Sequence, residues 1–199
     1  MIRGLFYGAR IGAGRRGGDV SNSSNTPGWL TPRSEEPEYD AALDALLADW
    51  IVGVAALAPD AVIVRREEEE AAPQGDNWCE YAVSEIARAT SAAFSRQGEE
   101  RVLQRRDETL TCTLSFFGPN GQSIGTRFLD GLLVSQNQDE LRRLGFAFGG
   151  HGALTGSSQQ INNQWVKRYD LTLRLYRTVA REYGVMALTQ APVTFFTGE

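Results

Sequence analysis

Histidine and cysteine, which supply a base and a nucleophile most readily at neutral pH, are scarce in this sequence. The single histidine, His151, stands in a Gly-Gly-His-Gly segment, and the cysteines are Cys79 and Cys112. A nucleophilic cysteine needs a nearby base to activate its thiol, yet both cysteines stand among apolar residues typical of strands. Neither has the CxxC spacing of a metal or redox site. We therefore expect structural, reduced thiols, and we expect no enzymatic activity, no cofactor and no metal.

Two other segments resemble ligand sites only superficially. Residues 12–17 read Gly-Ala-Gly-Arg-Arg-Gly, but a phosphate loop works between a strand and a helix, and neither is expected beside this segment. Residues 67–70 are four consecutive carboxylates, Glu67, Glu68, Glu69 and Glu70. A calcium loop instead alternates its acids with other residues and turns at a glycine. The acidic run is therefore expected to be a hydrated loop.

Charge is distributed unevenly along the 199 residues. The formal net charge is −5, but residues 1–34 hold five arginines and one aspartate, a net of +4, so the remainder carries −9. An acidic body argues against nucleic-acid binding over the whole surface. A basic N-terminal segment leaves open a nucleic-acid-binding adaptor that uses this segment alone. No run approaches the ~18 apolar residues of a membrane span, so no membrane association is expected.

Residues 1–38 are predicted to form a flexible N-terminal arm. The segment is rich in Gly, Ser, Asn, Arg and Pro, and such a composition cannot bury enough apolar surface to offset the entropy of ordering it. Two apolar islands interrupt it, and we interpret them as docking residues for a neighbouring molecule. The islands are Leu5, Phe6 and Tyr7, and then Trp29 and Leu30.

Residues 39–199 are predicted to form one domain with grouped strands. Apolar residues recur at helical spacing from Tyr39 until Pro59, which we expect to end the helix. Strands are then expected over 61–64, from 78 to about 86, and over 100–117. In the last of these, apolar residues alternate with Thr and Ser, the pattern of a strand with one buried face.

The second half of the chain is predicted to hold two helices and two strands. Pro119 is expected at the first position of one helix. Asn137 and Glu140 are spaced as the capping box of the next helix, in which Leu141 and Leu144 should face inward and which Gly145 should end. A Gly, Ser and Asn loop should reach about residue 163. The longest strand should follow, and residues 185–196 are expected to form a closing strand. This order predicts an α+β fold: a largely antiparallel β-sheet with helices packed on one face, plus the extended N-terminal arm.

From Tyr39 onward the chain resembles the phage neck terminator family and, more loosely, the tail terminators and minor tail proteins. The resemblance lies in the order and spacing of several short pieces over about four fifths of the sequence. These are the acidic and apolar helix 39–50, Asp-Asn-Trp-Cys at 76–79, Leu-Ser-Phe-Phe-Gly-Pro-Asn at 114–120, Gln-Asn at 136–137, and Asn-Gln-Trp-Val-Lys-Arg-Tyr-Asp-Leu-Thr-Leu at 163–173.

The resemblance implies a structural subunit of a tailed-phage virion, made in the cytoplasm of the bacterial host. Such a subunit would form a homo-oligomeric, hexameric ring that joins the tail tube to the head-side connector and lets DNA pass without sequence-specific binding. Its partners would be further copies, head–tail adaptor or connector proteins, and tail tube proteins, with sheath proteins as a further candidate. The run Glu67–Glu70 would line the lumen or an exposed rim. A baseplate or tail-completion protein of the same virion is the alternative.

Overall fold

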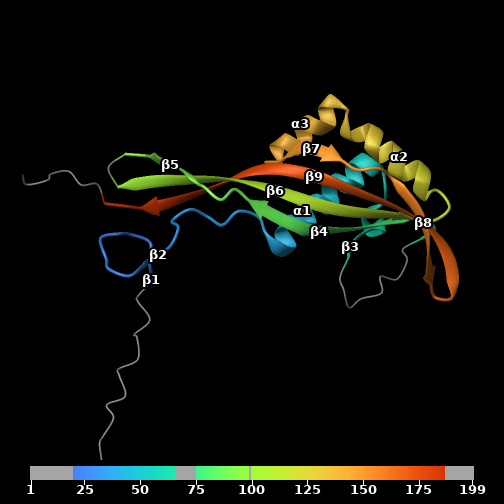
Figure 1. Ribbon diagram of the computed structural model, residues 1–199, viewed down its shortest axis with the longest axis horizontal. Helices are drawn as coiled ribbons and strands as arrows, with labels where there is room; N and C mark the ends of the chain where they lie inside the picture. Colours follow the sequence, from blue (N-terminus) through green and yellow to red (C-terminus); the bar gives the residue numbers. More distant parts are fainter. Residues whose placement is uncertain (1–19, 66–74, 99, 187–199) are drawn as a thin grey trace, which may run out of the picture.

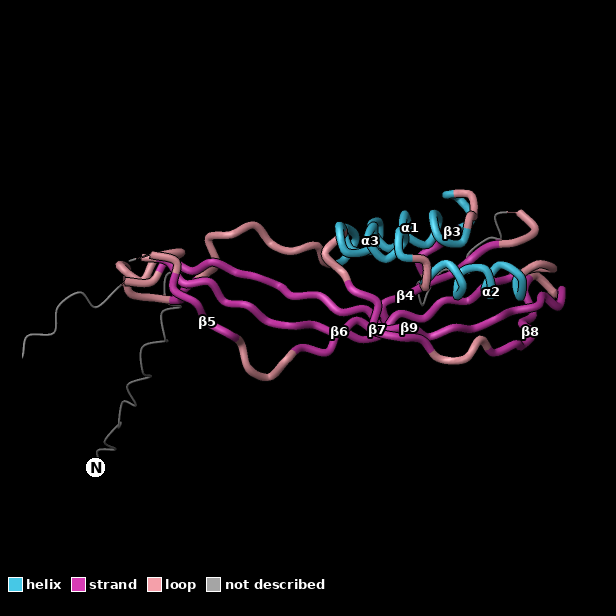
Figure 2. Tube along the Cα trace, turned by 90° about the horizontal axis from the view of Figure 1, so that it is seen from above, coloured by secondary structure: helices cyan, strands magenta, loops and turns pink. Residues whose placement is uncertain are grey.

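The three α-helices among the described residues of the computed structural model lie on the same side of a long, twisted sheet (Figures 1 and 2). The structure describes residues 20–65, 75–98 and 100–186. The helices gather over one end of the sheet, and the strands run on beyond them. Among the described residues no α-helix lies on the other face of the sheet, and we call this the bare face.

Seven strands form this sheet in the order β3-β4-β6-β9-β7, with β5 also paired to β6 and β8 also paired to β9. All pairs are antiparallel except β3 with β4. The strands are β3 (Val62–Val64), β4 (Trp78–Arg88), β5 (Ala93–Arg96), β6 (Arg101–Phe117), β7 (Ala147–His151), β8 (Thr155–Ile161) and β9 (Gln164–Gly184). The predicted α+β class, with a largely antiparallel sheet and helices on one face, is confirmed.

The central pair β6–β9 sets the core through its register. Leu110 lies opposite Leu175, and Leu114 opposite Leu171, so the alternating apolar residues of both strands fall on the helix-covered face. These side chains are almost fully buried. The apolar–polar alternation expected from the sequence is therefore seen in the structure as buried and exposed side chains, because one face of each strand packs beneath helices.

Helix α1 (Asp40–Ala55) covers this face with Leu43, Leu47 and Ile51 buried against the core. It ends earlier than predicted. Ala56 takes a left-handed conformation, with φ of 50°, and its N–H bonds to the carbonyl of Val52, which closes the last turn. Pro59 instead begins the 3₁₀ turn η1 (Pro59–Ala61).

The two later helices begin differently from the predictions. Helix α2 (Gly121–Leu132) follows a turn that contains Pro119, so this proline is not at the first helical position. Helix α3 (Ser135–Arg143) begins before Asn137, whose side chain donates to the carbonyl of Gly131 at 2.9 Å, so the capping box is wrong. Leu144 is exposed rather than inward-facing. Gly145, with φ of 85°, follows the helix end as expected.

The predicted loop before β9 is also wrong, because β7 and β8 occupy most of it. Both pair along the free edge of β9, which supplies backbone partners that compensate for the weak strand propensity of Gly, Ser and Gln. A two-residue turn, Asn162-Asn163, joins β8 to β9 with positive φ at both residues. The short strand β5 was not predicted either.

Beyond the helices, the sheet continues as a narrow projection that we call the β-extension. It consists of β5, residues 101–107 of β6 and residues 178–184 of β9 (Figure 1). Residues 20–38 run beside it and contain the short parallel strands β1 (Val20–Ser21) and β2 (Trp29–Leu30). The proposed closing strand at 185–196 is not seen in its first two residues, and 187–199 lie outside the described part.

Candidate assembly surface

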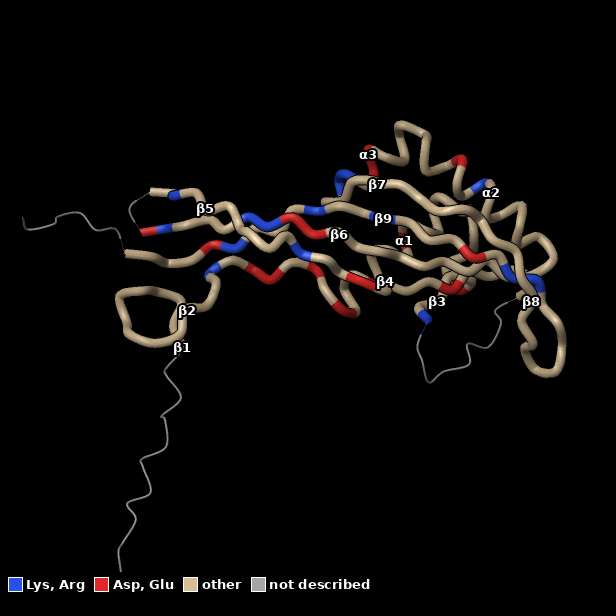
Figure 3. Tube along the Cα trace, in the orientation of Figure 1, with Lys and Arg blue, Asp and Glu red and all other residues tan. Residues whose placement is uncertain are grey.

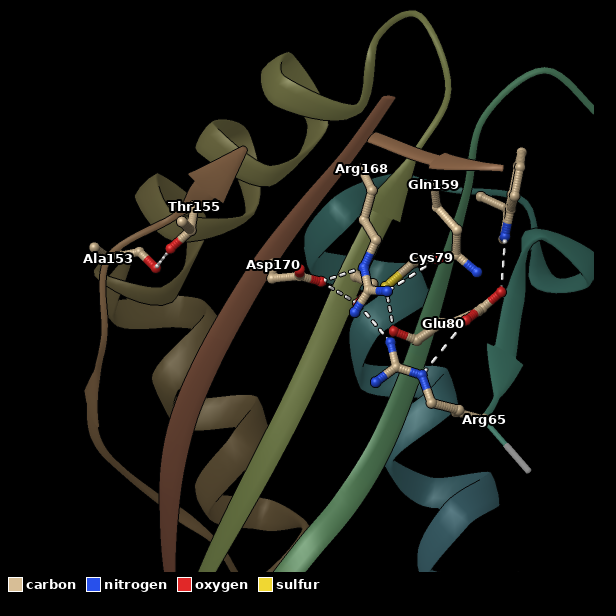
Figure 4. Close-up of polar contacts among 10 residues, drawn as sticks. Arg65, Cys79, Glu80, Ala153, Thr155, Gln159, Arg168 and Asp170 are labelled. Carbon is tan, nitrogen blue, oxygen red and sulfur yellow. Dashed lines mark hydrogen bonds and ion pairs between the residues drawn. The ribbon is translucent and has the colours of Figure 1, made fainter. Parts of the chain in front are cut away.

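A polar network crosses the bare face of the sheet near the ends of its strands (Figure 4). At its centre Ser115, on β6, is buried although it points away from the helices. Its hydroxyl donates to Oδ1 of Asp170 at 2.5 Å and accepts from Nη2 of Arg65 at 2.5 Å. One hydroxyl thereby connects the residue after β3 to β9 through β6.

Two more groups extend the network at each side. Arg168 donates to Asp170 at 2.7 Å and to Oε1 of Gln159 on β8 at 2.9 Å. On the other side, Glu80 accepts from Arg65 at 3.5 Å and from the Trp78 indole at 3.3 Å. The charges are balanced in pairs, so the network joins neighbouring strands and leaves no uncompensated charge among these residues.

An aromatic stack closes the same region. The rings of Trp78 and Phe117 are parallel with centroids 4.7 Å apart, and the guanidinium of Arg168 lies 5.7 Å from the Phe117 centroid. Phe117 is completely buried on the bare face because Trp78 and the β8–β9 hairpin cover it. This end of the bare face therefore has a small apolar cluster of its own.

A second charged cluster lies on the helix-covered face, where the β-extension leaves the body. Glu108 is buried and receives three partners: Arg177 at 2.9 Å, Arg88 at 2.8 Å and the Tyr39 hydroxyl at 2.6 Å. Arg177 also donates to the carbonyl of Glu38 at 2.7 Å and lies over the Tyr39 ring at 4.4 Å. The cluster therefore connects β4, β6 and β9 to the start of α1.

Sequence reasoning missed this cluster, although a signal for it was present. Glu108 continues the inward-facing series of β6, and Arg177 continues that of β9. A charged residue at the same point of two otherwise apolar series indicates that the two face each other, as their register confirms.

The predicted docking residues are placed only in part. Trp29 is 68% exposed and Leu30 is also exposed, on β2 at the far end of the β-extension. Leu5, Phe6 and Tyr7 lie outside the described residues. Within the arm, the Arg33 N–H donates to the Glu182 carbonyl at 2.7 Å, and Glu36 pairs with Arg181 at 3.1 Å.

The acidic run Glu67, Glu68, Glu69 and Glu70 also lies outside the described residues. Its flanks are known: Arg65 belongs to the bare-face network, and β4 begins at Trp78. The placement of the run at a lumen or a rim stays a prediction.

The two thiols are buried, whereas the only histidine is exposed. Cys79 and Cys112 are buried and free, and burial raises the pKa of both, that of Cys112 to about 12. His151 is exposed at the end of β7, with Nδ1 2.7 Å from the Gly152 carbonyl oxygen.

Within the described ranges no group of three or more His, Cys, Asp or Glu side chains is arranged to hold a metal ion. No helix among them is long and apolar enough to cross a membrane.

Comparison with known protein families gives a match over most of the chain. A family model described as phage neck terminator protein matches residues 41–199. Among solved structures, a chain from the virion of a native gene transfer agent particle is similar over 73% of this chain and 100% of its own length, at 14% identity and a TM-score of 0.33. No curated protein sequence matches significantly.

Proposed function

The chain belongs to the phage neck terminator family, and we propose that it is the subunit of a hexameric ring that joins the tail tube to the head-side connector. Family membership makes it a structural protein of the virion neck. The proposal adds the ring itself, the contact with tube and connector proteins on its two sides, and the passage of DNA through its lumen. The observation that carries it is the family match over residues 41–199.

The surface of the described residues supports an assembly role. Several large apolar side chains are exposed on the β-extension and beside it. Exposed apolar side chains add no stability to a monomer, but they can be buried in a contact with another molecule. These side chains are Trp29, Leu30, Phe94 and Met186. Positively and negatively charged residues also occur close together along the strands of the β-extension (Figure 3). Such a surface suits contacts with neighbouring subunits, which combine apolar anchors with a charged rim.

Two further assignments belong to this proposal. The N-terminal arm, residues 1–38, docks on a neighbouring subunit or ring through its two apolar islands. The run Glu67–Glu70 faces the DNA channel or a solvent-exposed rim, because four adjacent carboxylates are costly to bury without partners. In the channel, their charge would repel the phosphate backbone and keep DNA from adhering during its passage.

Imaging of purified particles tests the position of the subunit. An antibody fragment or a fused tag on this chain should appear where the tail meets the head, at one level along the tail axis. A label at the distal tip would indicate a baseplate or tail-completion protein and would overturn the proposal.

A further inference from the structure

Two unpaired charges of opposite sign lie at one level of the sheet, on its bare face. Glu85 on β4 is opposite Thr111 on β6, Thr111 is opposite Arg174 on β9, and Arg174 is opposite Gly150 on β7. The four residues therefore form one row across the sheet, with Glu85 at one edge. Arg174 stands one strand inside the other edge.

Neither charge has a partner among the described residues. Glu85 and Arg174 are both exposed, and neither takes part in a salt bridge or a side-chain hydrogen bond within the described ranges. By contrast, Arg65 and Arg168, which also lie on the bare face, are each paired with a carboxylate. The row thus leaves one carboxylate and one guanidinium available at opposite sides of the same molecule.

Gly150 leaves room for the guanidinium to reach the edge. A β-carbon added to Gly150 would be 3.9 Å from Nη2 of Arg174, so the arginine side chain extends over this glycine toward the outer side of β7. Gly150 also has a φ of 124°, which other residues rarely adopt. A side chain here would stand between Arg174 and any molecule beside β7.

The edges next to these charges are open within the described part of the chain. β3 pairs with β4 only as far as Tyr81, so β4 has no strand on that side at Glu85. β7 pairs only with β9. β4 and β7 run in opposite directions, because each step from β4 through β6 and β9 to β7 is antiparallel. A rotation about an axis along the strands would therefore bring β4 of one copy antiparallel to β7 of the next.

We propose that Glu85 of one copy pairs with Arg174 of the next copy across a β4–β7 junction. This inference rests on the proposed ring and assigns the edges that meet in it. Both edges carry a bulge, between Val83 and Glu85 and between Phe148 and Gly150, and bulges hinder pairing with arbitrary strands. The ion pair, held in one register, then gives the junction its specificity.

The dimensions of such a ring suit a DNA channel. At this level each copy contributes β4, β6, β9 and β7, spaced about 4.8 Å apart. Six copies with strands tilted as in barrels give a sheet-lined ring of roughly 40–50 Å diameter between backbones. The helices, which need more room than the bare face, lie outside, where the circumference is larger. The polar bare face then surrounds the lumen.

A charge swap tests the junction in assembled particles. Glu85→Arg and Arg174→Glu are each expected to lower the yield of particles with joined heads and tails by about tenfold or more, because like charges then meet at the junction. The double variant Glu85→Arg with Arg174→Glu restores the pair in reversed polarity and should recover most of that yield. Asp130→Arg, at an exposed carboxylate on α2 away from both strand edges, is the matched charge-reversal control and should assemble normally.

The outcomes separate this junction from the ring itself. Rescue by the double variant supports the junction, whereas a double variant no better than either single one overturns it, as do single variants without effect. Circular dichroism and thermal unfolding of each purified variant identify a loss of yield that is due to misfolding. The wild-type ring is measured independently by its mass, so a ring without rescue contradicts only the junction, and the absence of any ring contradicts the proposed function.

Discussion

Arg177 donates from Nε to Oε2 of Glu108 at 2.9 Å, and both side chains are buried where the β-extension leaves the body. The two residues lie directly opposite each other in the β6–β9 register. Burial of an ion pair is costly unless further hydrogen bonds satisfy both partners. Arg88 and Tyr39 supply these bonds to Glu108, and the Glu38 carbonyl supplies one to Arg177. The cluster therefore fixes the start of α1 against the base of the β-extension.

Arg177→Met should be strongly destabilising. The substitution removes the buried arginine that pairs with Glu108, and breaking a buried ion pair typically costs about 3–5 kcal/mol. Because Arg88 remains beside Glu108, we expect the lower end of that range in urea unfolding. Arg101→Met is the control, since Arg101 is exposed and 3.9 Å from Glu182, and it should change stability by less than about 1 kcal/mol. Equal losses in the two variants would contradict a structural role for the cluster.

The apolar periodicity of the sequence predicted those elements whose conformation follows from their own residue pattern. β6 and β9 were recognised because Leu110 and Leu175 belong to strict apolar alternations that one buried face requires. β8 was missed because its Gly, Ser and Gln residues carry no such pattern, and its strand conformation depends on the edge of β9. The positive φ of Asn162 and Asn163 shows that this Asn pair was the available turn signal.

Candidate site residues were likewise predicted only where a local sequence pattern marks them. Trp29 and Leu30 were interpreted as docking residues; both side chains are exposed, and their docking stays a prediction. The Arg65–Ser115–Asp170 network could not be predicted, because its members are far apart in the sequence and meet only through the strand order.

Ser115→Ala should weaken the bare face of the sheet without unfolding the protein. The hydroxyl bonds both Arg65 and Asp170, and loss of hydrogen bonds to charged groups costs about 1.5–3 kcal/mol. Thermal unfolding measures the effect. Ser84→Ala is a suitable control, because the Ser84 hydroxyl is exposed and bonds only the Thr111 carbonyl, at 3.1 Å. An effect of Ser115→Ala no larger than that of the control would show that the network adds little.

The buried thiols should make the protein less stable at high pH. Burial raises the pKa of Cys112 from 9.0 to about 12, and it raises those of Cys79 and Tyr81 as well. A folded-state pKa above the unfolded one contributes stability that is complete below the unfolded pKa and is lost as pH rises through the folded value. Stability should therefore fall between about pH 9 and 12, and less steeply in Cys112→Ala.

A thiol reagent provides the matching test at neutral pH. Neither cysteine should react in the folded protein, and both should react in denaturant, because the thiolate is the reactive form and burial disfavours it. Rapid labelling of either cysteine in the folded protein would contradict the buried placement.

Removal of residues 1–38 tests the boundary of the N-terminal arm. We expect residues 39–199 to stay folded, because the main core lies within them, and we expect attachment to the neighbouring ring to weaken. Some stability should also be lost with the contacts of Arg33 and Glu36 to β9. Circular dichroism and particle yield are the two measurements. A truncated protein that cannot fold would show that the boundary is wrong.

A narrower variant tests docking alone. Trp29→Ala with Leu30→Ala should reduce attachment without affecting the fold, since both side chains are exposed in the single chain. Phe94→Ala, at another exposed aromatic residue of the β-extension, is the comparison. Attachment that falls equally in both would assign docking to the whole β-extension instead of the arm.

Replacement of Glu67, Glu68, Glu69 and Glu70 with glutamine tests the acidic run. Folding should be unchanged, because a hydrated loop does not depend on its charges. DNA packaging or ejection should become slower if the run lines the channel, and should be unaffected if it lies on an outer rim. Failure of the variant to assemble, together with salt-sensitive assembly of the wild type, would instead indicate a buried interface with arginines such as Arg142 and Arg143.

The mass of the assembled subunit tests the central claim most directly. Necks released from purified particles, or rings of the full chain assembled in solution, can be measured by native mass spectrometry and by symmetry-free electron microscopy. The ring proposal predicts six copies of the chain in a closed assembly with a central channel. A single copy of the chain at the neck of intact particles would contradict it.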